Sequence, residues 1–475
     1  MPTRAPSLQK ARTGIEGLDE ITHGGLPKGR TTLVSGSAGA GKTVFGIEFL
    51  VHGALMFDEP GVFITFVETE KELAQDVASF GFDLEALQEE GKLAIEHVHL
   101  DREDTAESGE YDLEGLFIRL ARAVEAVHAK RVVLDTIEVL FSALKDQSAV
   151  RSELLRLFRW LKDHELTSVV TSERGNGILS RLGIEEYVAD CVILLDHRVT
   201  DQISTRRIRV VKYRGSRHEM DEHPFLMGES GISVIPVTSA ALDYNANTER
   251  VSSGVPGIDA MLGGLGFFRA SSILVSGTTG TGKTTLALTF LAAGCERGET
   301  ALYIGFEESL SQIVRNMRSI GLDLETWQEK GLLHFNTLRA SSLGLEAHLA
   351  SIMQSVKNTK PRLVAIDPMS DFLEASNRTH VKSMITRLVD FLKLNEITAL
   401  FTRLPSPFEQ TEVSIERISS LVDTVLILRH VERGNRHSKF LHIMKSRGMN
   451  HSSNVAELIL TGNGIRISEP QEEIA

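Results

Sequence analysis

Apolar, often β-branched runs alternate along the chain with segments that are predicted to be helical, such as residues 43–55 after the first run. The predicted strands cover residues 31–35, 62–66, 131–135 and 167–171 in the first half, and 272–276, 301–305, 363–367 and 398–402 in the second. Because these runs are apolar throughout, they predict parallel strands covered by helices on both faces. Ligands bind such sheets at the carboxyl ends of the strands.

The second half of the chain repeats the first. Segment 253–259 repeats segment 13–19 at an offset of 240 positions, and later motifs follow in the same order at slightly different offsets. Conserved motif order with drifting loop lengths predicts two homologous domains, as a chain of 475 residues also does. We place these domains at residues 1–238 and 251–475, joined by a linker at 239–250 that lacks sustained periodicity.

Each half contains one glycine-rich loop of the form G-x-x-x-x-G-K-[ST], between a predicted strand and a predicted helix. In this motif backbone amides bind phosphates, the lysine reaches the β and γ oxygens, and the threonine contributes to a Mg²⁺ site. We therefore expect ATP or GTP, with Mg²⁺, in both halves. The expected nucleotide-binding residues are Gly39, Ala40, Gly41, Lys42, Thr43, Val44 and Ser79 in the first half, and Gly280, Thr281, Gly282, Lys283, Thr284 and Thr285 in the second.

An aspartate ends the third predicted strand of each half, at Asp135 and Asp367. A carboxylate there can face the threonine of the loop, Thr43 or Thr284, and hold Mg²⁺ partly through water. An ordinary aspartate that caps a turn is the alternative. Its recurrence in both halves favours the metal role.

Glutamates follow the second predicted strand of each half. The second half reads Phe-Glu-Glu-Ser at 306–309, whereas the first reads Phe-Val-Glu-Thr at 66–69. A glutamate at this place can orient or deprotonate the nucleophile that attacks the γ-phosphate. Glu68, Glu307 and Glu308 are therefore candidate catalytic residues, although glutamates at exposed helix starts are common.

A basic cluster recurs near the end of each half. Its members are Lys212, Arg214 and His218 in the first half, and Lys445, Arg447 and His451 in the second. Solvent-exposed basic turns are the usual explanation for such clusters. Their recurrence in register favours cations supplied to the γ-phosphate of a neighbouring subunit, as arginine fingers are, and this role requires an oligomer.

In combination, these motifs resemble those of the KaiC family, double-domain RecA-like ATPases best known from the phosphorylating ring of the circadian clock. The shared motifs are Gly-x-x-Gly-x-Asp, the Gly-Lys-Thr loop, Phe-x-Glu and Lys-x-Arg-Gly-x-x-His, and the resemblance covers residues 13–467. It implies an α/β fold of two tandem RecA-like P-loop NTPase domains with mainly parallel central sheets. It also implies a homohexamer of two stacked rings, with ATP at the subunit interfaces.

The resemblance further implies serine autokinase activity in the second ring, directed at two hydroxyl residues of the adjacent subunit. Ser419 and Ser420 occupy the acceptor positions, and Glu307 is then the candidate base. The aligned residues of the first half are Glu186 and Tyr187, so the first ring is expected to serve hydrolysis and assembly.

The chain departs from the family pattern at three places. Val67 stands where the family has the first glutamate of a pair, so the rate of hydrolysis in the first ring is open. Ile320 stands where the clock protein has a tryptophan, which predicts weaker stacking on the adenine. Since the chain ends soon after Ile467, we expect the tail that binds KaiA to be absent. A KaiA-independent homologue is the expectation, with a KaiB-like protein or another signalling partner as a candidate.

Composition limits the alternatives. A net charge of −13 and an aromatic content of 6% disfavour a RecA-like DNA recombination or helicase motor, which would need a basic or aromatic strand-binding surface. A nucleotide-switched scaffold without kinase activity stays compatible with the motifs.

Cys191 and Cys295 lie in different halves, and no Cys/His cluster predicts zinc. Without a long apolar run or an apolar signal segment, the chain is expected to be a cytoplasmic enzyme that contacts neither membrane nor nucleic acid.

Overall fold

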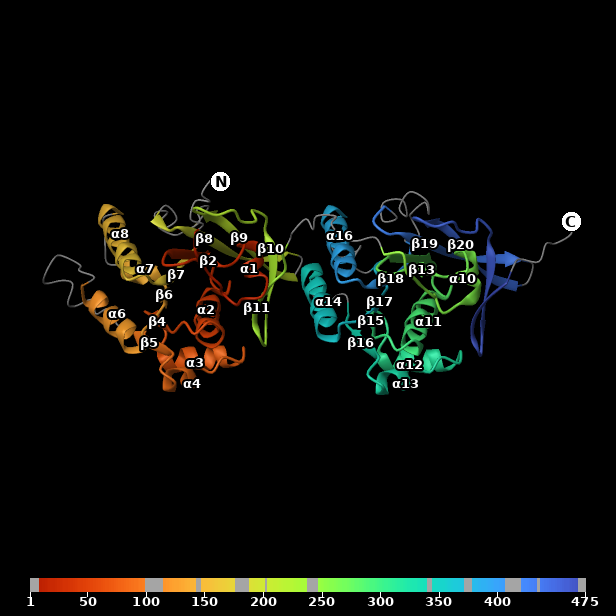
Figure 1. Ribbon diagram of the computed structural model, residues 1–475, viewed down its shortest axis with the longest axis horizontal. Coiled ribbons are helices and arrows are strands. Elements are labelled where there is room, and N and C mark those ends of the chain that lie inside the picture. The colour runs from red at the N-terminus through yellow and green to blue at the C-terminus, as the bar shows by residue number, and fades with distance from the viewer. Residues whose placement is uncertain are drawn as a thin grey trace, which may run out of the picture. The chain divides into compact units, whose positions relative to one another are not determined.

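The computed structural model describes residues 8–98, 114–141, 147–175, 188–200, 203–236, 247–339, 344–370, 378–405, 420–433 and 436–468. The chain divides into two compact units, Met1–Thr238 and Ser239–Ala475 (Figure 1). Within the described ranges, each unit has a nine-stranded sheet and a separate two-stranded one. None of the helices in this part of the chain has both the length and the apolar character that a bilayer span requires.

The elements of the first unit follow one another as strand, helix and strand. In chain order they are β1 (Lys10–Ala11), α1 (Leu18–Ile21), β2 (Leu26–Pro27), β3 (Thr31–Gly36), α2 (Lys42–Met56), β4 (Gly61–Thr65), α3 (Glu70–Ala78), α4 (Leu84–Glu89), β5 (Leu93–His97), α6 (Glu114–Val127), β6 (Arg131–Asp135), α7 (Ile137–Phe141), α8 (Gln147–Asp163), β7 (Thr167–Glu173), β8 (Cys191–Thr200), β9 (Ile203–Tyr213), β10 (His223–Gly228) and β11 (Gly231–Val234).

The second unit repeats this order. Its elements are β12 (Arg250–Val251), α10 (Pro256–Met261), β13 (Phe267–Phe268), β14 (Ser272–Gly277), α11 (Lys283–Glu296), β15 (Ala301–Gly305), α12 (Leu310–Arg318), α13 (Glu325–Glu329), β16 (Leu333–Thr337), α14 (Leu345–Thr359), β17 (Leu363–Asp367), α16 (Arg378–Leu394), β18 (Thr398–Arg403), β19 (Thr424–Arg433), β20 (Arg436–Ser446), β21 (Ala456–Thr461) and β22 (Gly464–Ser468).

Both large sheets are parallel around the P-loop strand and antiparallel at one end. The order in the first unit is β11-β10-β9-β8-β3-β7-β6-β4-β5, in which the pairs from β8 to β5 are parallel and those from β8 to β11 are antiparallel. The second unit has the equivalent order β16-β15-β17-β18-β14-β19-β20-β21-β22. The predicted strands and the mainly parallel sheets are confirmed. The antiparallel extension was not predicted.

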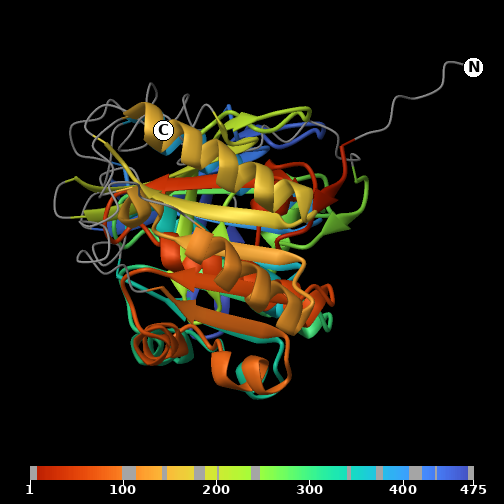
Figure 2. The ribbon, with the colours of Figure 1, turned by 90° about the vertical axis from the view of Figure 1, so that its left-hand side faces the viewer.

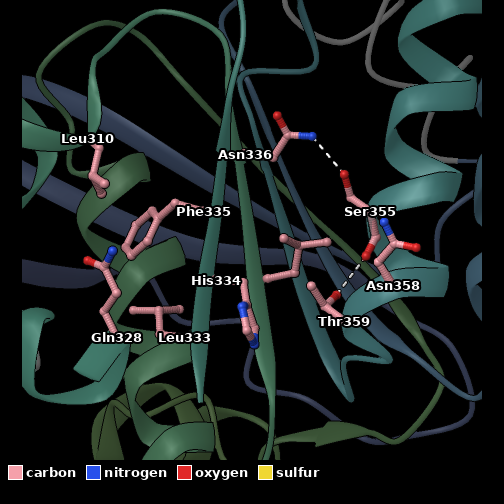
Figure 3. Close-up of a pocket in the computed structure, with 10 residues that line it drawn as sticks. Leu310, Gln328, Leu333, His334, Phe335, Asn336, Ser355, Asn358 and Thr359 are labelled. Atoms are coloured by element: carbon pink, nitrogen blue, oxygen red, sulfur yellow. Dashed lines mark hydrogen bonds between the residues drawn. The ribbon is translucent and has the colours of Figure 1, made fainter. Parts of the chain in front are cut away.

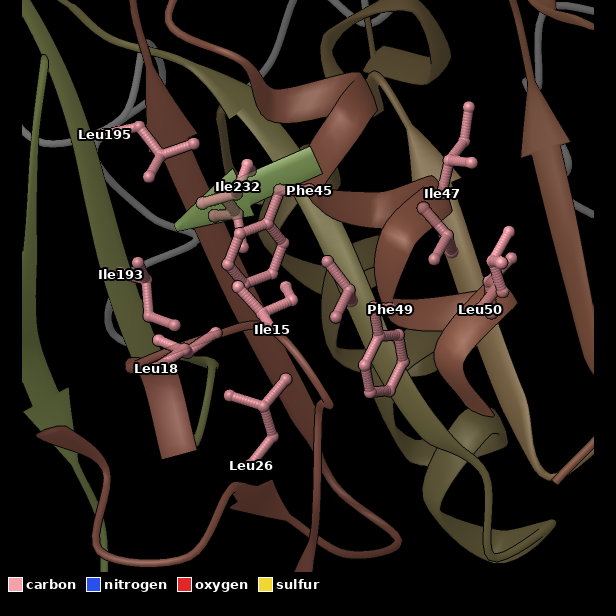
Figure 4. Packing of buried hydrophobic residues seen from close by; sticks show 14 of the residues in the cluster. Ile15, Leu18, Leu26, Phe45, Ile47, Phe49, Leu50, Ile193, Leu195 and Ile232 are labelled. Atoms are coloured by element: carbon pink, nitrogen blue, oxygen red, sulfur yellow. The ribbon is translucent and has the colours of Figure 1, made fainter. Parts of the chain in front are cut away.

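Side chains of the central strands alternate between two apolar clusters. In β4, Phe63 belongs to the cluster around α2, whereas Val62 and Ile64 belong to the cluster that α6 and α8 form on the other face. Figure 2 shows these two helices, in orange and gold, against the strands of the first unit. In Figure 4, Phe45 and Phe49 project from α2 among residues of neighbouring strands. Because α2 begins directly after the P-loop, its burial fixes the position of the loop.

A buried arginine joins the start of β6 to the end of α2. The Arg131 guanidinium is fully buried; its Nε donates to Glu59 (2.8 Å) and its Nη1 to the carbonyl oxygen of Phe49 (2.7 Å). The Arg131 side chain fits because Gly53 has no Cβ, which would lie 2.6 Å from the arginine Cδ. The second unit has Leu363 at this place, beside Gly294, so an apolar contact replaces the polar one.

We expect Arg131→Ala to lower the free energy of unfolding of the first unit by about 3–5 kcal/mol. The substitution removes the buried guanidinium that binds Glu59 and the carbonyl oxygen of Phe49, and it leaves the largely buried Glu59 carboxylate with only Lys28, 3.5 Å away. Denaturant unfolding followed by Trp160 fluorescence measures this in a chain that also carries Trp327→Phe, which removes the second of the two tryptophans.

Arg30→Ala is the matched control. The Arg30 guanidinium is one-third exposed and lies 3.5 Å from Asp190, so its loss is expected to cost less than about 1 kcal/mol. Equal losses for the two variants would contradict the structural role of Arg131.

Candidate active sites

The first P-loop connects β3 to α2. Gly39 and Gly41 have φ values of 72° and 97°, which only glycine adopts without strain, and they turn the loop toward the helix start. Lys42 and Thr43 then open α2, where free amides and the helix dipole favour phosphate. The Lys42 ammonium donates to the carbonyl oxygens of Gly36 (2.9 Å) and Ser37 (3.1 Å). The loop therefore lies between a strand and a helix, as its sequence predicts.

The aspartate of the first site lies against the P-loop threonine. The Thr43 hydroxyl donates to Asp135 Oδ2 (2.7 Å), and the Thr171 hydroxyl donates to Asp135 Oδ1. A hydroxyl and a carboxylate are the oxygen donors that Mg²⁺ prefers, so this pair fits the expected ion. In the described part of the chain no cluster of three or more His, Cys, Asp or Glu side chains could hold a metal.

The catalytic candidate of the first site lies in a turn after β4. The Glu68 amide donates to the Thr65 hydroxyl (3.1 Å), and that hydroxyl donates to the Glu68 carbonyl oxygen (2.9 Å). Burial raises the pKa of Glu68, and the nearby carboxylates of Asp135 and Asp76 raise it further. Val67 is 67% exposed and makes no contribution to the acid chemistry. Ser79 lies exposed at the end of α3, and no described hydrogen bond joins it to the P-loop.

A pocket of about 470 Å³ lies over the second P-loop and brings most of the predicted residues of that half together. It is lined by Gly280, Gly282, Lys283, Thr284 and Thr285 of the loop, by Glu307, Glu308 and Asp367, and by Thr279, Asn316, Met317, Ile320, Pro368, Leu404 and Leu460. Thr281 is buried, and its hydroxyl donates to the carbonyl oxygen of Thr278 (2.8 Å), so it shapes the loop. Burial lowers the pKa of Lys283, against the opposing effect of Asp367.

Two contacts distinguish the second site from the first. The Asn316 amide donates to Glu308 (3.2 Å), whereas the corresponding residue of the first half, Asp76, carries a charge that raises the pKa of Glu68. In both sites, one oxygen of the aspartate accepts a hydrogen bond from a strand threonine, which is Thr402 for Asp367 and Thr171 for Asp135. The second oxygen of Asp367 accepts from the Tyr303 hydroxyl (2.7 Å).

The sequence did not predict the contacts that the two aspartates make with Thr171, Thr402 and Tyr303. The two threonines lie in register near the ends of the fourth strands of the two halves, and that recurrence was the signal that could have identified them.

The basic clusters occupy equivalent positions in the two units. The Arg214 guanidinium lies 3.9 Å from Asp190, and that of Arg447 lies 3.9 Å from Asp423; each arginine side chain is 51% exposed. Lys212 and Lys445 belong to the ends of β9 and β20, and His218 and His451 follow them. Lys445, Arg447 and His451 are absent from the lining of the pocket over the second P-loop.

One of the two expected acceptor serines is described. Ser420 is exposed, and its carbonyl oxygen accepts a hydrogen bond from Arg447 (2.7 Å). Ser419 lies outside the described residues, as do Glu186 and Tyr187, the residues aligned with the acceptor pair in the first half.

A separate pocket of about 390 Å³ lies along strand β16 (Figure 3). Leu333 and Phe335 point to one side of the strand, and His334 and Asn336 to the other. The Asn336 amide donates to the Ser355 hydroxyl (2.8 Å). This pocket contains none of the residues predicted from the sequence, and its polar groups are at least partly satisfied within the protein.

Both halves of the chain are similar to known proteins. A family model for the KaiC ATPase matches residues 11–239 and 251–472. The chain belongs to the KaiC family.

It is 50% identical over 468 residues to the circadian clock protein KaiC2 of Synechocystis sp., an alignment that covers 98% of this chain and 82% of that protein. It is 39% identical to the circadian clock oscillator protein KaiC of Picosynechococcus sp., over 97% of this chain and 90% of that protein. The KaiC of Parathermosynechococcus lividus is 38% identical, with 97% and 86% covered. The chain is thus a KaiC-family ATPase with two tandem RecA-like domains, and one candidate nucleotide site lies in each matched range.

Asp76→Asn is expected to move the acid limb of the first site's pH–rate profile for ATP hydrolysis to lower pH. The Asp76 charge raises the pKa of Glu68, so its removal lets Glu68 ionise, and accept a proton, at a lower pH. The measurement uses chains in which Lys283→Ala silences the second P-loop.

Asp83→Asn is the control, because Asp83 caps α4 and asparagine preserves that cap. An acid limb that stays in place, or moves to higher pH, in Asp76→Asn would contradict the assigned role of Glu68.

Proposed function

We propose that the first half of this chain hydrolyses ATP and supports assembly, and that the second half is a serine autokinase that transfers the γ-phosphate to Ser419 and Ser420. The observation that carries this proposal is the pair Glu307 and Glu308 in the wall of the pocket over the second P-loop. The first half has Val67 in place of Glu307, beside Glu68. The two sites therefore offer different numbers of proton acceptors.

Phosphoryl transfer depends mainly on positioning and on neutralising the charge of the phosphates. In the second site the P-loop amides and Lys283 would hold the phosphates. Thr284 and Asp367 would hold Mg²⁺, partly through water, and the ion would supply positive charge that offsets the charge of the phosphates. Glu307 would accept the proton of the attacking serine hydroxyl, with Glu308 held beside it by Asn316.

The basic cluster of the second half supports a shared site. Arg447 is half-exposed and contacts Asp423 and Ser420 of its own chain rather than the wall of its own nucleotide pocket. We infer that it reaches the γ-phosphate bound to an adjacent subunit, and that Lys445 and His451 act with it. The first-half cluster would act in the same way in a first ring. This arrangement requires a homo-oligomer, and the family resemblance favours a hexamer of two stacked rings.

A signalling role in which the ATP state recruits a KaiB-like partner is compatible with this chemistry. The relatives named above are circadian clock proteins, and a weakly hydrolysing first site would prolong the ATP state. A DNA motor is disfavoured, because the chain has a net charge of −13. If this chain binds a KaiB-like protein with the same affinity in ATP as in ADP, the role as a nucleotide-switched scaffold is excluded.

The autokinase proposal predicts that incubation with labelled ATP places label in the peptide that spans residues 417–423. Glu307→Gln combined with Glu308→Gln is expected to reduce this label at least about a hundredfold, because removal of a general base costs roughly 10²–10⁴ in rate.

Glu68→Gln is the matched control, since it changes the corresponding glutamate of the first half. It is expected to lower ATP hydrolysis and to leave the label in the 417–423 peptide. Label elsewhere in the chain, or label that survives the double substitution, would overturn the autokinase assignment.

A further inference from the structure

The aspartates of the two sites accept different hydrogen bonds, although the sheets around them are alike. Both have one oxygen bound by a strand threonine, Thr171 or Thr402. The other oxygen of Asp135 accepts from the P-loop threonine Thr43 (2.7 Å). Among the described contacts of Asp367, the corresponding oxygen accepts from Tyr303 instead (2.7 Å), and no hydrogen bond joins it to Thr284.

A tyrosine can occupy this place only because of a glycine two residues later. Tyr303 is buried, and a Cβ on Gly305 would lie 2.7 Å from its ring carbon Cε1. Gly305 pairs with Asp367 in the parallel sheet, just as Thr65 pairs with Asp135 in the first unit. The first half therefore combines Phe63 with Thr65 where the second combines Tyr303 with Gly305. The two halves thus differ at both positions, and in the second half the absence of a Cβ at Gly305 leaves room for the ring whose hydroxyl contacts Asp367.

We propose that Tyr303 is a positioning residue that sets the Mg²⁺ requirement of the second site. The Tyr303 hydroxyl donates to Asp367 Oδ2. The corresponding oxygen of Asp135 in the first site accepts from the P-loop threonine, Thr43. Thr284 and the waters of a bound ion must then compete with the phenol for the Asp367 carboxylate. The second site should thus take up Mg²⁺ with nucleotide only at a higher Mg²⁺ concentration than it would without the phenol.

The physical basis is that one carboxylate can interact strongly with only a few hydrogen-bond donors and metal-bound waters at the same time. A donor to an ionised carboxylate forms a strong hydrogen bond and withdraws charge from the oxygen that accepts it. Partners that hydrogen-bond to metal-holding residues are typically worth about 10–100-fold in metal affinity, and their loss usually weakens binding because they orient the ligand. Tyr303 acts in the opposite direction, because it occupies the carboxylate oxygen that the P-loop threonine uses in the first site. The inference rests on the nucleotide and Mg²⁺ site proposed above, but it does not depend on phosphate transfer to serine.

The test is Tyr303→Phe, which keeps the ring and removes only the hydroxyl. It is made in chains that carry Lys42→Ala, so that binding of a fluorescent ATP analogue reports the second site. The quantity measured is the Mg²⁺ concentration that gives half of the maximal gain in analogue affinity. We expect Tyr303→Phe to lower this concentration about tenfold, and to leave analogue affinity without Mg²⁺ unchanged.

Tyr213→Phe is the control for loss of a buried phenol, since the Tyr213 hydroxyl donates to the carbonyl oxygen of Gly25 (2.9 Å), in the other unit. It should leave the Mg²⁺ requirement as it is. An unchanged or higher requirement in Tyr303→Phe would overturn the inference, as would a loss of affinity without Mg²⁺. If Mg²⁺ does not raise analogue affinity even in the parent chain, the proposed metal site fails as well. Absence of label on the serines alone would leave the inference standing.

Discussion

The parallel pairing of the central strands is the constraint on which both sites depend. It brings the P-loop strand, the aspartate strand and the strand between them to one edge of the sheet with their carboxyl ends together. Asp135 thus meets Thr43 and Thr171, which come from elements far apart in the sequence. The apolar side chains that bury α2 against this sheet then fix the start of the helix, where the phosphates would lie.

The two halves share this strand arrangement and differ in the side chains around their nucleotide sites. The differing pairs around the nucleotide sites are Val67 and Glu307, Asp76 and Asn316, and Phe63 and Tyr303. None of these substitutions disturbs the strand register, which is equivalent in the two units. Each alters a proton acceptor or its neighbour. The chemistry of a nucleotide site can therefore diverge at low cost to the fold.

The sequence predicted the features that depend on local pattern. The strands ending at Asp135 and Asp367 coincide with the predicted ones, because buried parallel strands are continuous apolar runs. The antiparallel extension from β8 to β11 was missed, since its pairing joins strands whose polar and apolar residues are mixed. The contact of Tyr303 was missed for another reason. A tyrosine in an apolar strand is not distinguished from a core residue until the sheet places Gly305 and Asp367 around it.

In the proposed mechanism, the second P-loop of one chain phosphorylates the serines of the next chain, which also supplies Arg447. The most direct measurement mixes Arg447→Ala chains with tagged Lys283→Ala chains, adds labelled ATP and separates the two. Neither variant alone should be labelled. In the mixture, a complete site combines the P-loop of an Arg447→Ala chain with Arg447 and the serines of a Lys283→Ala chain. We therefore expect label on the Lys283→Ala chain. Label on the Arg447→Ala chain, or on neither, would contradict it.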